Sequence, residues 1–330
     1  MKATLHVKLL CCWLLAGCYT VRSDGAAYHS RRQATSGPTL AVIPGEIWDE
    51  SWCSKLPEWN PPRTSPALVL QVLSEHYVHL EYNFIYHMEL NSDFTRENLF
   101  IVCLDEESEA FLDSTFGIKC VRPDLGDGDG MSRKDVWTLR SHIASCLVLA
   151  GHDVLLSDAD AIWLKDPIQE MNRVGAGESD VVSSRGKLPG YLHRAWGATL
   201  CFGFVLLRSG GPAMPEFLRT MARMVDTLND DQKAGNEALN IMGVAWDSEG
   251  SDMRLIDSTA LGRGLVFADE GPMSVALLPH DTFSRFCDST NVDLENTTVV
   301  AHCYSRAKGE KMTAWMKAEG LWQDAGSHQL

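Results

Sequence analysis

Two aspartates interrupt an apolar run in the middle of the chain. Asp158 and Asp160 lie one residue apart in the stretch VLLSDADAIWLKDP, residues 154–167. Burying two like charges beside leucine, isoleucine and tryptophan is costly unless a cation or strong hydrogen-bond donors hold them. Carboxylates at positions i and i+2 of a strand end point the same way and offer two hard oxygen ligands. We therefore interpret the pair as ligands of a divalent cation, against the alternative of a solvated acidic turn.

Capping signals indicate the elements that position this pair. Residues 154–156 predict a buried strand that ends at the aspartates. Ser132 and Asp135 give an S-x-x-D signal for the start of a helix that precedes this strand. Asp166 followed by Pro167 predicts the next helix, with Asp as the N-cap and Pro at the first helical position.

Strands and helices alternate along the rest of the chain. The predicted strands are residues 67–72, 99–104, 117–121, 180–183, 200–207 and 298–301, and the further predicted helices are residues 77–90, 214–228 and 236–241. Strand, helix and strand with short connections indicate an α/β domain with a mostly parallel, Rossmann-like sheet flanked by helices. Such sheets bind ligands at the carboxyl ends of their strands, which is where the aspartate pair lies.

The composition indicates an acidic globular protein. The chain has 330 residues, of which 45% are hydrophobic, enough for one large α/β domain or two small ones. Its formal net charge is −15. Binding to nucleic acid or to an anionic membrane surface needs clustered Lys and Arg, so we expect no nucleic-acid partner.

The first residues have the pattern of a targeting segment. Lys2 and Lys8 precede a short apolar stretch, residues 9–21, which falls short of a comfortable bilayer span. We predict that residues 1–21 are a signal peptide or a short signal-anchor, so that anchoring to a membrane through the amino terminus stays open. LAGC, residues 15–18, also fits a bacterial lipoprotein cleavage box.

The remaining organisation fits a lumenal protein. Residues 22–65 are rich in Ser, Pro, Gly and Arg and predict a flexible stem, followed by a folded domain over residues 66–330. The ten cysteines form no C-x-x-C pair, and one or two disulfides are expected. Cys146 is interpreted as a core residue. Asn296 begins a glycosylation sequon. We predict the secretory pathway, with the Golgi lumen or secretion as the destination.

The stretch GHDVLLSDADAIWLKDP resembles the core motif of the eukaryotic nucleotide-diphospho-sugar transferase family, which includes plant cell-wall xylosyl- and arabinosyltransferases and related galactosyltransferases. The likeness runs from about residue 66 to residue 322. The other matching motifs, in order, are LD (104–105), GF (203–204), ALN (238–240), LPHDTFSR (278–285), VVAHCY (299–304), AKGEKM (307–312) and GLW (320–322). The resemblance implies a GT-A-like fold, a nucleotide-sugar donor, a glycan or glycoprotein acceptor, bound Mn²⁺ or Mg²⁺, and transfer with retention of anomeric configuration.

The resemblance also implies a metal site. Asp158 and Asp160 match the family's D-x-D pair, in which the second Asp contacts the metal and the first reaches ribose or metal. His302, at the end of a predicted strand, matches a histidine that completes the metal site in many GT-A enzymes. The alternative for His302 is a core or surface histidine without a ligand role.

Five further residues match positions near the donor in the family. Asp105 lies where the nucleoside is commonly held, although it equally fits a cap after a strand. Lys308 and Lys311 lie where a base that contacts the diphosphate is expected, or else in a solvated loop. Glu237 and Asn240 are assigned to catalysis, against the alternative that Glu237 is only an acid on a helix face.

The chain departs from the family pattern at two places. Gly235-Asn236-Glu237 stands where relatives often carry DQ, with Asp230-Asp231-Gln232 displaced upstream, and TLCFGF stands where NTGF is common. Both departures fall near the expected sugar and acceptor pockets, so donor and acceptor stay open. Arg140, on the helix before the aspartates, either reaches a phosphate or covers the exposed side of that helix, and we favour the second.

Two other function classes compete with a glycosyltransferase. A haloacid-dehalogenase-type phosphatase also places Asp-x-Asp at a strand end, but there the motif opens the domain and the residue at the position of Ile162 is usually Thr or Val. A secreted, non-catalytic binding protein of the same fold is the second alternative. Release of phosphate, release of nucleoside diphosphate, or binding without either would distinguish the three classes.

Overall fold

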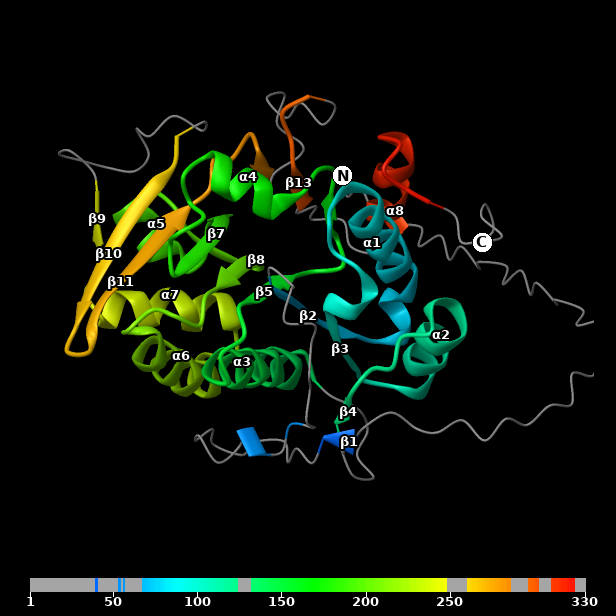
Figure 1. Cartoon of the computed structure of the whole chain (residues 1–330), viewed down its shortest axis with the longest axis horizontal. Coiled ribbons are helices and arrows are strands. Elements are labelled where there is room, and N and C mark those ends of the chain that lie inside the picture. Colours follow the sequence, from blue (N-terminus) through cyan, green and yellow to red (C-terminus); the bar gives the residue numbers. More distant parts are fainter. Residues whose placement is uncertain are drawn as a thin grey trace, which may run out of the picture. The chain divides into compact units, whose positions relative to one another are not determined.

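A computed structural model describes residues 39–40, 53–54, 56, 67–123, 132–247, 260–285, 296–302 and 310–323 (Figure 1). All of these belong to one compact unit, residues 37–330. The predicted signal segment, residues 1–21, lies outside the described residues. Among the helices of the described ranges, none is both long and apolar enough to cross a membrane.

An eight-stranded sheet forms the centre of the unit, in the order β3-β2-β5-β8-β7-β11-β10-β9. Only β8 and β10 run against the direction of the other strands, so the predicted mostly parallel α/β sheet is confirmed. The strands are β2 Leu68–Leu73, β3 Leu99–Cys103, β5 Val154–Ser157, β7 Val181–Gly186, β8 Thr199–Leu207, β9 Ala245–Trp246, β10 Gly262–Ala268 and β11 Gly271–Leu277.

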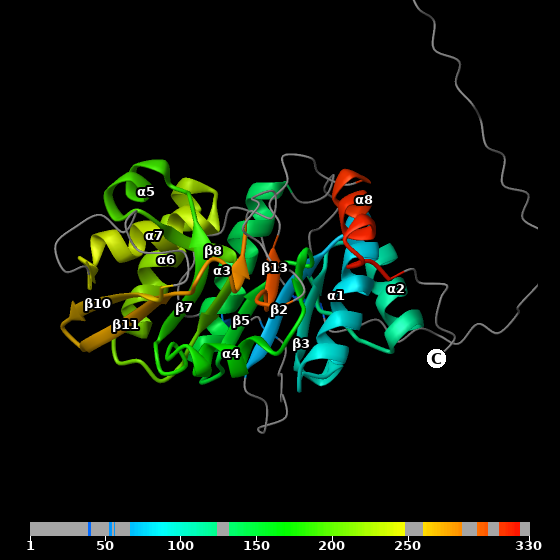
Figure 2. The same cartoon turned by 90° about the horizontal axis from the view of Figure 1, so that it is seen from above.

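Helices cover both faces of this sheet (Figures 1 and 2). The side chains of α3, α6 and α7 share one hydrophobic core with one face, and those of α1, α2 and α4 share a second core with the other. The apolar side chains of each strand alternate between the two cores, as expected for a sheet buried on both sides. The helices are α1 Val78–Asn91, α2 Glu106–Phe116, α3 Arg133–Leu149, α4 Pro167–Arg173, α5 Gly190–Trp196, α6 Met214–Leu228, α7 Asp231–Ile241 and α8 Glu310–Ala318.

A small second sheet brings a late part of the chain to the aspartates. It consists of β12 Phe283–Ser284, β13 Val300–His302 and β6 Ala161–Trp163, in that order. β13 pairs antiparallel with β6, so that His302 lies opposite Ala161. The predicted strand that ends at His302 is therefore present, and its partner is the segment that directly follows Asp160.

Several local predictions are confirmed and others need correction. The capping box of Ser132 and Asp135 starts α3, and Asp166 caps α4 with Pro167 at its first position. The helix predicted to begin at residue 236 begins at Asp231 instead, because the side chain of Asp230 accepts a hydrogen bond from the backbone N–H of Lys233 and caps it there. Residues 117–121 contribute only an isolated bridge at position 121 in place of a full strand.

Two disulfides tie segments to the sheet and its helices. Cys53 is bonded to Cys146, and Cys103 to Cys120. The interpretation of Cys146 as a simple core residue is therefore incomplete, because it lies in the core and is also covalently linked to the predicted stem. Apolar spacing on a helix is the same for a packed cysteine and for half of a disulfide, so the sequence alone could not separate them. Among the described residues, Cys201 is the free thiol.

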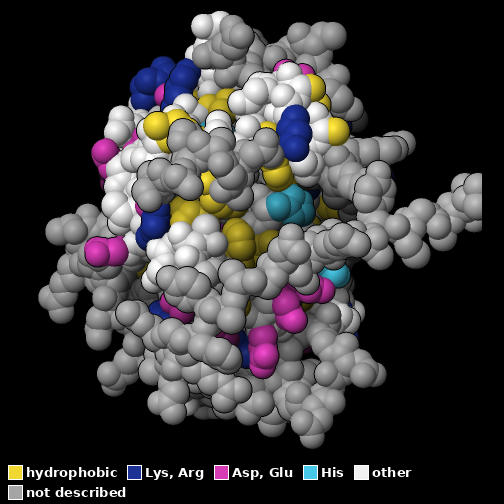
Figure 3. Space-filling view, turned by 90° about the vertical axis from the view of Figure 1, so that its right-hand side faces the viewer, with side chains coloured by type: hydrophobic (Ala, Val, Ile, Leu, Met, Phe, Trp, Pro, Cys, Tyr) yellow, Lys and Arg dark blue, Asp and Glu magenta, His cyan; other side chains and the backbone are white. Residues whose placement is uncertain are grey.

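The face of the unit viewed in Figure 3 carries acidic and basic side chains interspersed with exposed hydrophobic and histidine side chains. Lys317 lies over the ring of Trp322, 5.5 Å from its centroid, and His79 contacts the same ring at 5.7 Å. These contacts join the end of α8 to α1.

The expectation of no nucleic-acid partner rests on the net charge and stays a prediction.

Glu81 is an ionisable residue in a buried environment. It lies in the first turn of α1, is fully buried, and neither carboxylate oxygen has a hydrogen-bond partner among the described residues. Burial raises the pKa of Glu81 to about 8. The native protein therefore keeps this side chain protonated at neutral pH.

We expect Glu81 to make the stability fall as the pH rises. The unfolded chain loses this proton near the ordinary Glu value of about 4.3, whereas the native chain keeps it to about pH 8. The free energy of unfolding should therefore decrease between these two pH values, by up to about 4–5 kcal/mol. Glu81→Gln should match the wild type near pH 4 and exceed it at pH 8 in urea unfolding. Glu107→Gln, on the exposed side of α2, is the control. A difference that does not change with pH would contradict a protonated Glu81.

Candidate metal and donor site

The aspartate pair occupies the turn between β5 and β6. The backbone N–H of Asp158 donates to the carbonyl of Gly203 on β8 at 2.9 Å, and the N–H of Ala161 donates to the carbonyl of Asp158 at 2.8 Å. Below the turn, the indole N–H of buried Trp163 donates to the hydroxyl of Ser157 at 3.3 Å. The apolar residues of the run thus anchor the turn, and the aspartates stand at the carboxyl end of β5 as predicted.

His302 faces both aspartates. Its Nε2 lies 3.3 Å from Oδ1 of Asp160 and 3.5 Å from Oδ2 of Asp158. One ligand atom from each of the three residues lies within 4.8 Å of the other two. The imidazole is buried, whereas the side chain of Asp158 is 35% exposed and that of Asp160 is 24% exposed. The group is therefore open to solvent on the aspartate side. The structure thus brings together the three residues that were predicted as metal ligands.

The charges of these groups depend on one another. Burial alone would lower the pKa of His302, but Asp160 and Cys201 raise it to about 10. Burial alone would raise the pKa of Asp160, but His302 and Arg285 hold it below the ordinary value. The imidazolium therefore supplies positive charge between the carboxylates, and a metal ion that took this place would have to displace the Nε2 proton.

The position of Arg140 differs from the predicted one on the exposed side of its helix. Arg140 does not cover an exposed helix side but is buried, and its guanidinium bonds the carboxylates of both Asp158 and Asp231 and the carbonyl of Phe202. Burial alone would lower the pKa of Arg140, but Asp231 and Asp158 raise it, so the side chain is charged. Asp231 was not selected from the sequence; the signal for it is the Asp-Gln pair next to Asp230, which starts α7.

Gly203 leaves the space that the site needs. A Cβ at this position would lie 2.1 Å from Cε1 of His302 and 2.5 Å from Oδ2 of Asp158. Any side chain on this part of β8 would therefore push two of the three candidate ligands apart. The close approach explains why glycine is required in a strand interior at this point.

The far side of the imidazole has its own partners. Nδ1 of His302 lies 3.7 Å from Sγ of Cys201 and 3.2 Å from Nη1 of Arg285, and Arg285 also contacts that sulfur. Burial alone would raise the pKa of the Cys201 thiol, but Arg285 and His302 lower it below the ordinary value. Neither Cys201 nor Arg285 was selected from the sequence, because no spacing rule relates them to His302.

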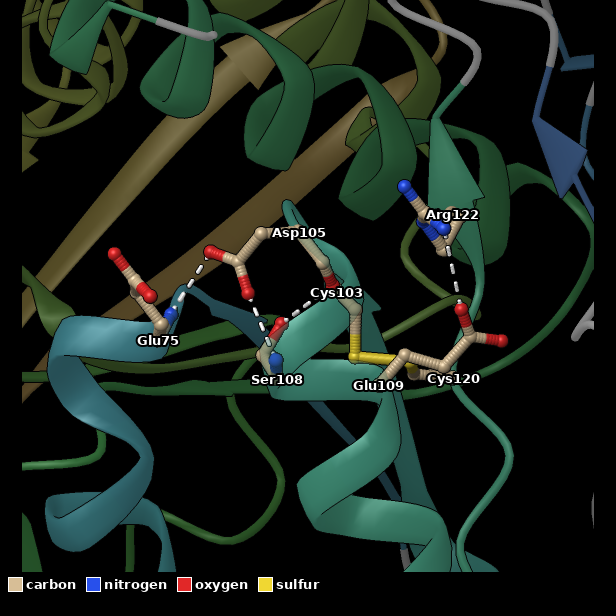
Figure 4. Close-up of a disulfide and its surroundings, with 7 residues drawn as sticks. All are labelled: Glu75, Cys103, Asp105, Ser108, Glu109, Cys120 and Arg122. Carbon is tan, nitrogen blue, oxygen red and sulfur yellow. Dashed lines mark hydrogen bonds and ion pairs between the residues drawn. A yellow bond between two sulfur atoms is a disulfide. The ribbon is translucent and has the colours of Figure 1, made fainter.

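Asp105 is engaged in capping (Figure 4). Its Oδ1 accepts from the backbone N–H of Ser108 in α2, and its Oδ2 accepts from the backbone N–H of Glu75 ahead of α1, both at 2.8 Å. Asp105 follows β3, whose last residue, Cys103, forms a disulfide with Cys120. This arrangement is the cap alternative from the sequence, and contact with a nucleoside stays a prediction.

Glu237 and Asn240, the predicted catalytic pair, lie on α7, toward its carboxyl end from Asp231. Glu237 bonds the phenol of Tyr191 in α5, and the amide of Asn240 donates to Glu237 at 3.4 Å. At about 1.5 Å per residue, Glu237 lies roughly 9 Å along the helix from Asp231. The hydrogen bonds of Glu237 therefore link it to Tyr191 and Asn240.

The two predicted lysines are not placed by side-chain contacts. Lys308 lies outside the described residues, and Lys311 is in the first turn of α8, where only the backbone is described. Both follow β13, which ends at His302. Their role at a diphosphate stays a prediction.

Two carboxylates and one imidazole form a donor set that fits Mn²⁺ or Mg²⁺. Mn²⁺ and Mg²⁺ prefer carboxylate oxygen, so the two aspartates set the preference and His302 would add a third ligand. The space kept by Gly203 and the open aspartate side would leave room for ligands from a bound molecule. The arrangement suits chemistry in which a cation holds and neutralises an anionic group.

Comparisons with known proteins identify a family for most of the chain. Residues 95–314, two thirds of the chain, match the family model of nucleotide-diphospho-sugar transferases. No match is found among curated proteins. Three of the solved structures that match are all of low identity. GlyE, a glycosyltransferase of Streptococcus pneumoniae TIGR4, has 11% identity and a TM-score of 0.44, over 79% of this chain and 66% of GlyE. The bifunctional glycosyltransferase WbbM has 13% identity and a TM-score of 0.39 (54% of this chain, 38% of WbbM), and mouse xyloside xylosyltransferase 1 has 13% identity and a TM-score of 0.31 (53% and 81%). The chain spans less than two thirds of GlyE and of WbbM.

Gly203→Ala should remove cation binding while the sheet still forms. The new methyl group would displace His302 and Asp158, so we expect the rise in melting temperature that Mn²⁺ produces in the wild type to be lost. Gly210→Ala is the matched control, because its Cβ would meet nothing within 4 Å. A full Mn²⁺ shift in a folded Gly203→Ala protein would contradict the assignment of the site.

Arg140→Met should lower the free energy of unfolding, because Arg140 also neutralises the buried carboxylate of Asp231. It leaves Asp231 buried without its counter-charge, which typically costs about 3–5 kcal/mol. Adding Asp231→Asn should recover part of the loss, because the buried charge is then gone. Urea unfolding of the single and double variants measures both values. Equal losses in the two variants would mean that Asp231 does not depend on Arg140.

Proposed function

Because the chain belongs to the nucleotide-diphospho-sugar transferase family of glycosyltransferases, we propose that it moves a sugar from a nucleotide-diphosphate donor, a UDP-sugar, to a glycan or glycoprotein acceptor with retention of configuration. The observation that supports a metal-dependent reaction is the convergence of Asp158, Asp160 and His302 at the carboxyl end of β5. Mn²⁺ or Mg²⁺ is the proposed cofactor.

A cation held by these residues would neutralise the charge that grows on the diphosphate as the glycosidic bond breaks. Asp158 and Asp160 would supply oxygen ligands to it, and His302 would supply Nε2. Arg140 fixes the Asp158 carboxylate from behind, so this ligand is oriented before the donor arrives. A cation held there would stabilise the leaving diphosphate, so that no protein acid would be required at that oxygen.

Other residues are proposed to contact the two substrates. We place Lys308 and Lys311 at the diphosphate, because the segment that carries them leaves β13 directly after His302. We place Glu237 and Asn240 beside the transferred sugar or the acceptor, because Asn240 is exposed on α7 and Glu237, which is half-buried, bonds both Asn240 and Tyr191. Near the nucleoside, Asp105 would act by holding the starts of α1 and α2, because its carboxylate oxygens already accept two backbone N–H groups.

We also propose that the protein works in the secretory pathway, with the Golgi lumen as the site of action. The two disulfides support an oxidising compartment. Asn296, the sequon residue, is exposed and accessible to a glycan. A type II anchor and a soluble form are both compatible with this proposal.

Asp160→Asn should reduce donor hydrolysis and sugar transfer by at least about a hundredfold, because it removes one ligand charge that is needed most as the diphosphate leaves. The measurement is nucleoside diphosphate release from a panel of UDP- and GDP-sugars with Mn²⁺. Near-UV circular dichroism checks that the variant is folded.

Asp269→Asn, on the exposed β10–β11 turn, is the matched control and should keep full activity. Full activity of folded Asp160→Asn would overturn the proposed mechanism. Phosphate release from phosphoesters without nucleoside diphosphate release would favour the phosphatase alternative. Wild-type protein that shows neither activity nor a thermal shift with Mn²⁺ and UDP would favour the binding-protein alternative.

A further inference from the structure

His302 contacts different kinds of groups through its two ring nitrogens. Nε2 faces the carboxylates of Asp158 and Asp160, whereas Nδ1 faces Cys201 and Arg285. The state of Nδ1 decides what Nε2 can do, because a neutral imidazole carries one proton in total. If Nε2 is to present its lone pair to a cation, the proton must be on Nδ1, and Nδ1 then needs an acceptor.

Of the two groups at Nδ1, only one can accept. A guanidinium has donors and no acceptor, so Arg285 could only donate to Nδ1 and would hold the proton on Nε2. The sulfur of Cys201 can accept, and it lies within contact of both Nδ1 and Arg285. The sulfur can therefore receive both donors at once and leave Nε2 free.

The surroundings of Cys201 show that it does not simply fill space. The residue is completely buried on β8, yet it belongs to none of the three hydrophobic clusters of the described residues. Its backbone N–H donates to the hydroxyl of Ser183 at 2.9 Å, and that hydroxyl donates back to its carbonyl at 3.1 Å. Cys201 is also not one of the three residues whose ligand atoms converge. The sulfur thus lies behind the histidine ring in a polar setting.

We propose that Cys201 is a positioning residue for the metal site: its sulfur accepts hydrogen bonds from Nδ1 of His302 and from Arg285 and so presents Nε2 to the cation. This inference rests on the proposed function, because it needs His302 to be a metal ligand. It assigns a role to the position where the resemblance leads one to expect the asparagine of NTGF.

The test is Mn²⁺ affinity, measured on the full chain without nucleotide by electron paramagnetic resonance of free Mn²⁺. Cys201→Ala removes the acceptor and should weaken Mn²⁺ binding by about 10- to 100-fold, the range seen when a partner of a metal-bound histidine is lost. Cys201→Ser keeps an acceptor and should stay within about threefold of the wild type by the same reasoning. Val205→Ala removes a buried side chain from the same strand and should lower the melting temperature without changing Mn²⁺ affinity.

The outcomes separate the two levels of inference. Wild-type protein that binds no Mn²⁺ would overturn both the proposed metal dependence and the role of Cys201. Wild-type binding with unchanged affinity in Cys201→Ala would overturn only the role of Cys201. Equal weakening in Cys201→Ala and Cys201→Ser would also overturn it, because an acceptor would then make no difference.

Arg285 provides a second check on the same arrangement. Without the sulfur, Arg285 is left to donate to Nδ1, which holds the proton on Nε2. Arg285→Ala should therefore increase Mn²⁺ affinity more in the Cys201→Ala background than in the wild type, as a double-mutant cycle measures. Equal effects in the two backgrounds would contradict competition between Arg285 and the sulfur for His302.

Discussion

The repulsion between two adjacent carboxylates is the interaction on which the rest of the site depends. Asp158 and Asp160 can share one turn only because positive groups approach from other parts of the chain. Arg140 comes from α3, and His302 comes from β13 through its pairing with β6. Each of these groups is buried, so the fold must hold them in place before any cation binds. The turn is thus stabilised by charged groups from distant parts of the chain as well as by its own hydrogen bonds.

The reversed strand β8 makes this arrangement fit. It lies between β5 and β7 and runs against both, and it receives the Asp158 N–H at Gly203. From this one strand the site obtains an empty position at Gly203, a sulfur at Cys201 and a carbonyl at Phe202 that accepts from Arg140. A parallel strand here would present its residues in the opposite order along the edge. The departure from a fully parallel sheet is therefore part of how the ligands are placed.

The sequence predicts local features well and long-range partners poorly. The capping box at Ser132, the start of α4 at Pro167 and the strand before Asp158 are specified by neighbouring residues, and all three are present. The partnership of Arg140 with Asp231 is different, because it depends on where α7 begins relative to α3. The resemblance named His302 by motif order, whereas Cys201 and Arg285 become visible only when the fold brings β8 and the end of β12 to the imidazole. Charge pairing across the sheet is thus the part that composition and spacing do not encode.

The pairing of β6 with β13 also has a consequence for how the protein is made. Synthesis runs from the amino terminus, so Asp158, Asp160 and Arg140 emerge from the ribosome well before His302. Until β13 arrives and adds its imidazole, Asp158 has Arg140 as a partner, whereas Asp160 lacks the contact with His302 that it has in the folded protein. Maturation of the site is in this sense ordered in time, with the residue that closes it translated last of the four.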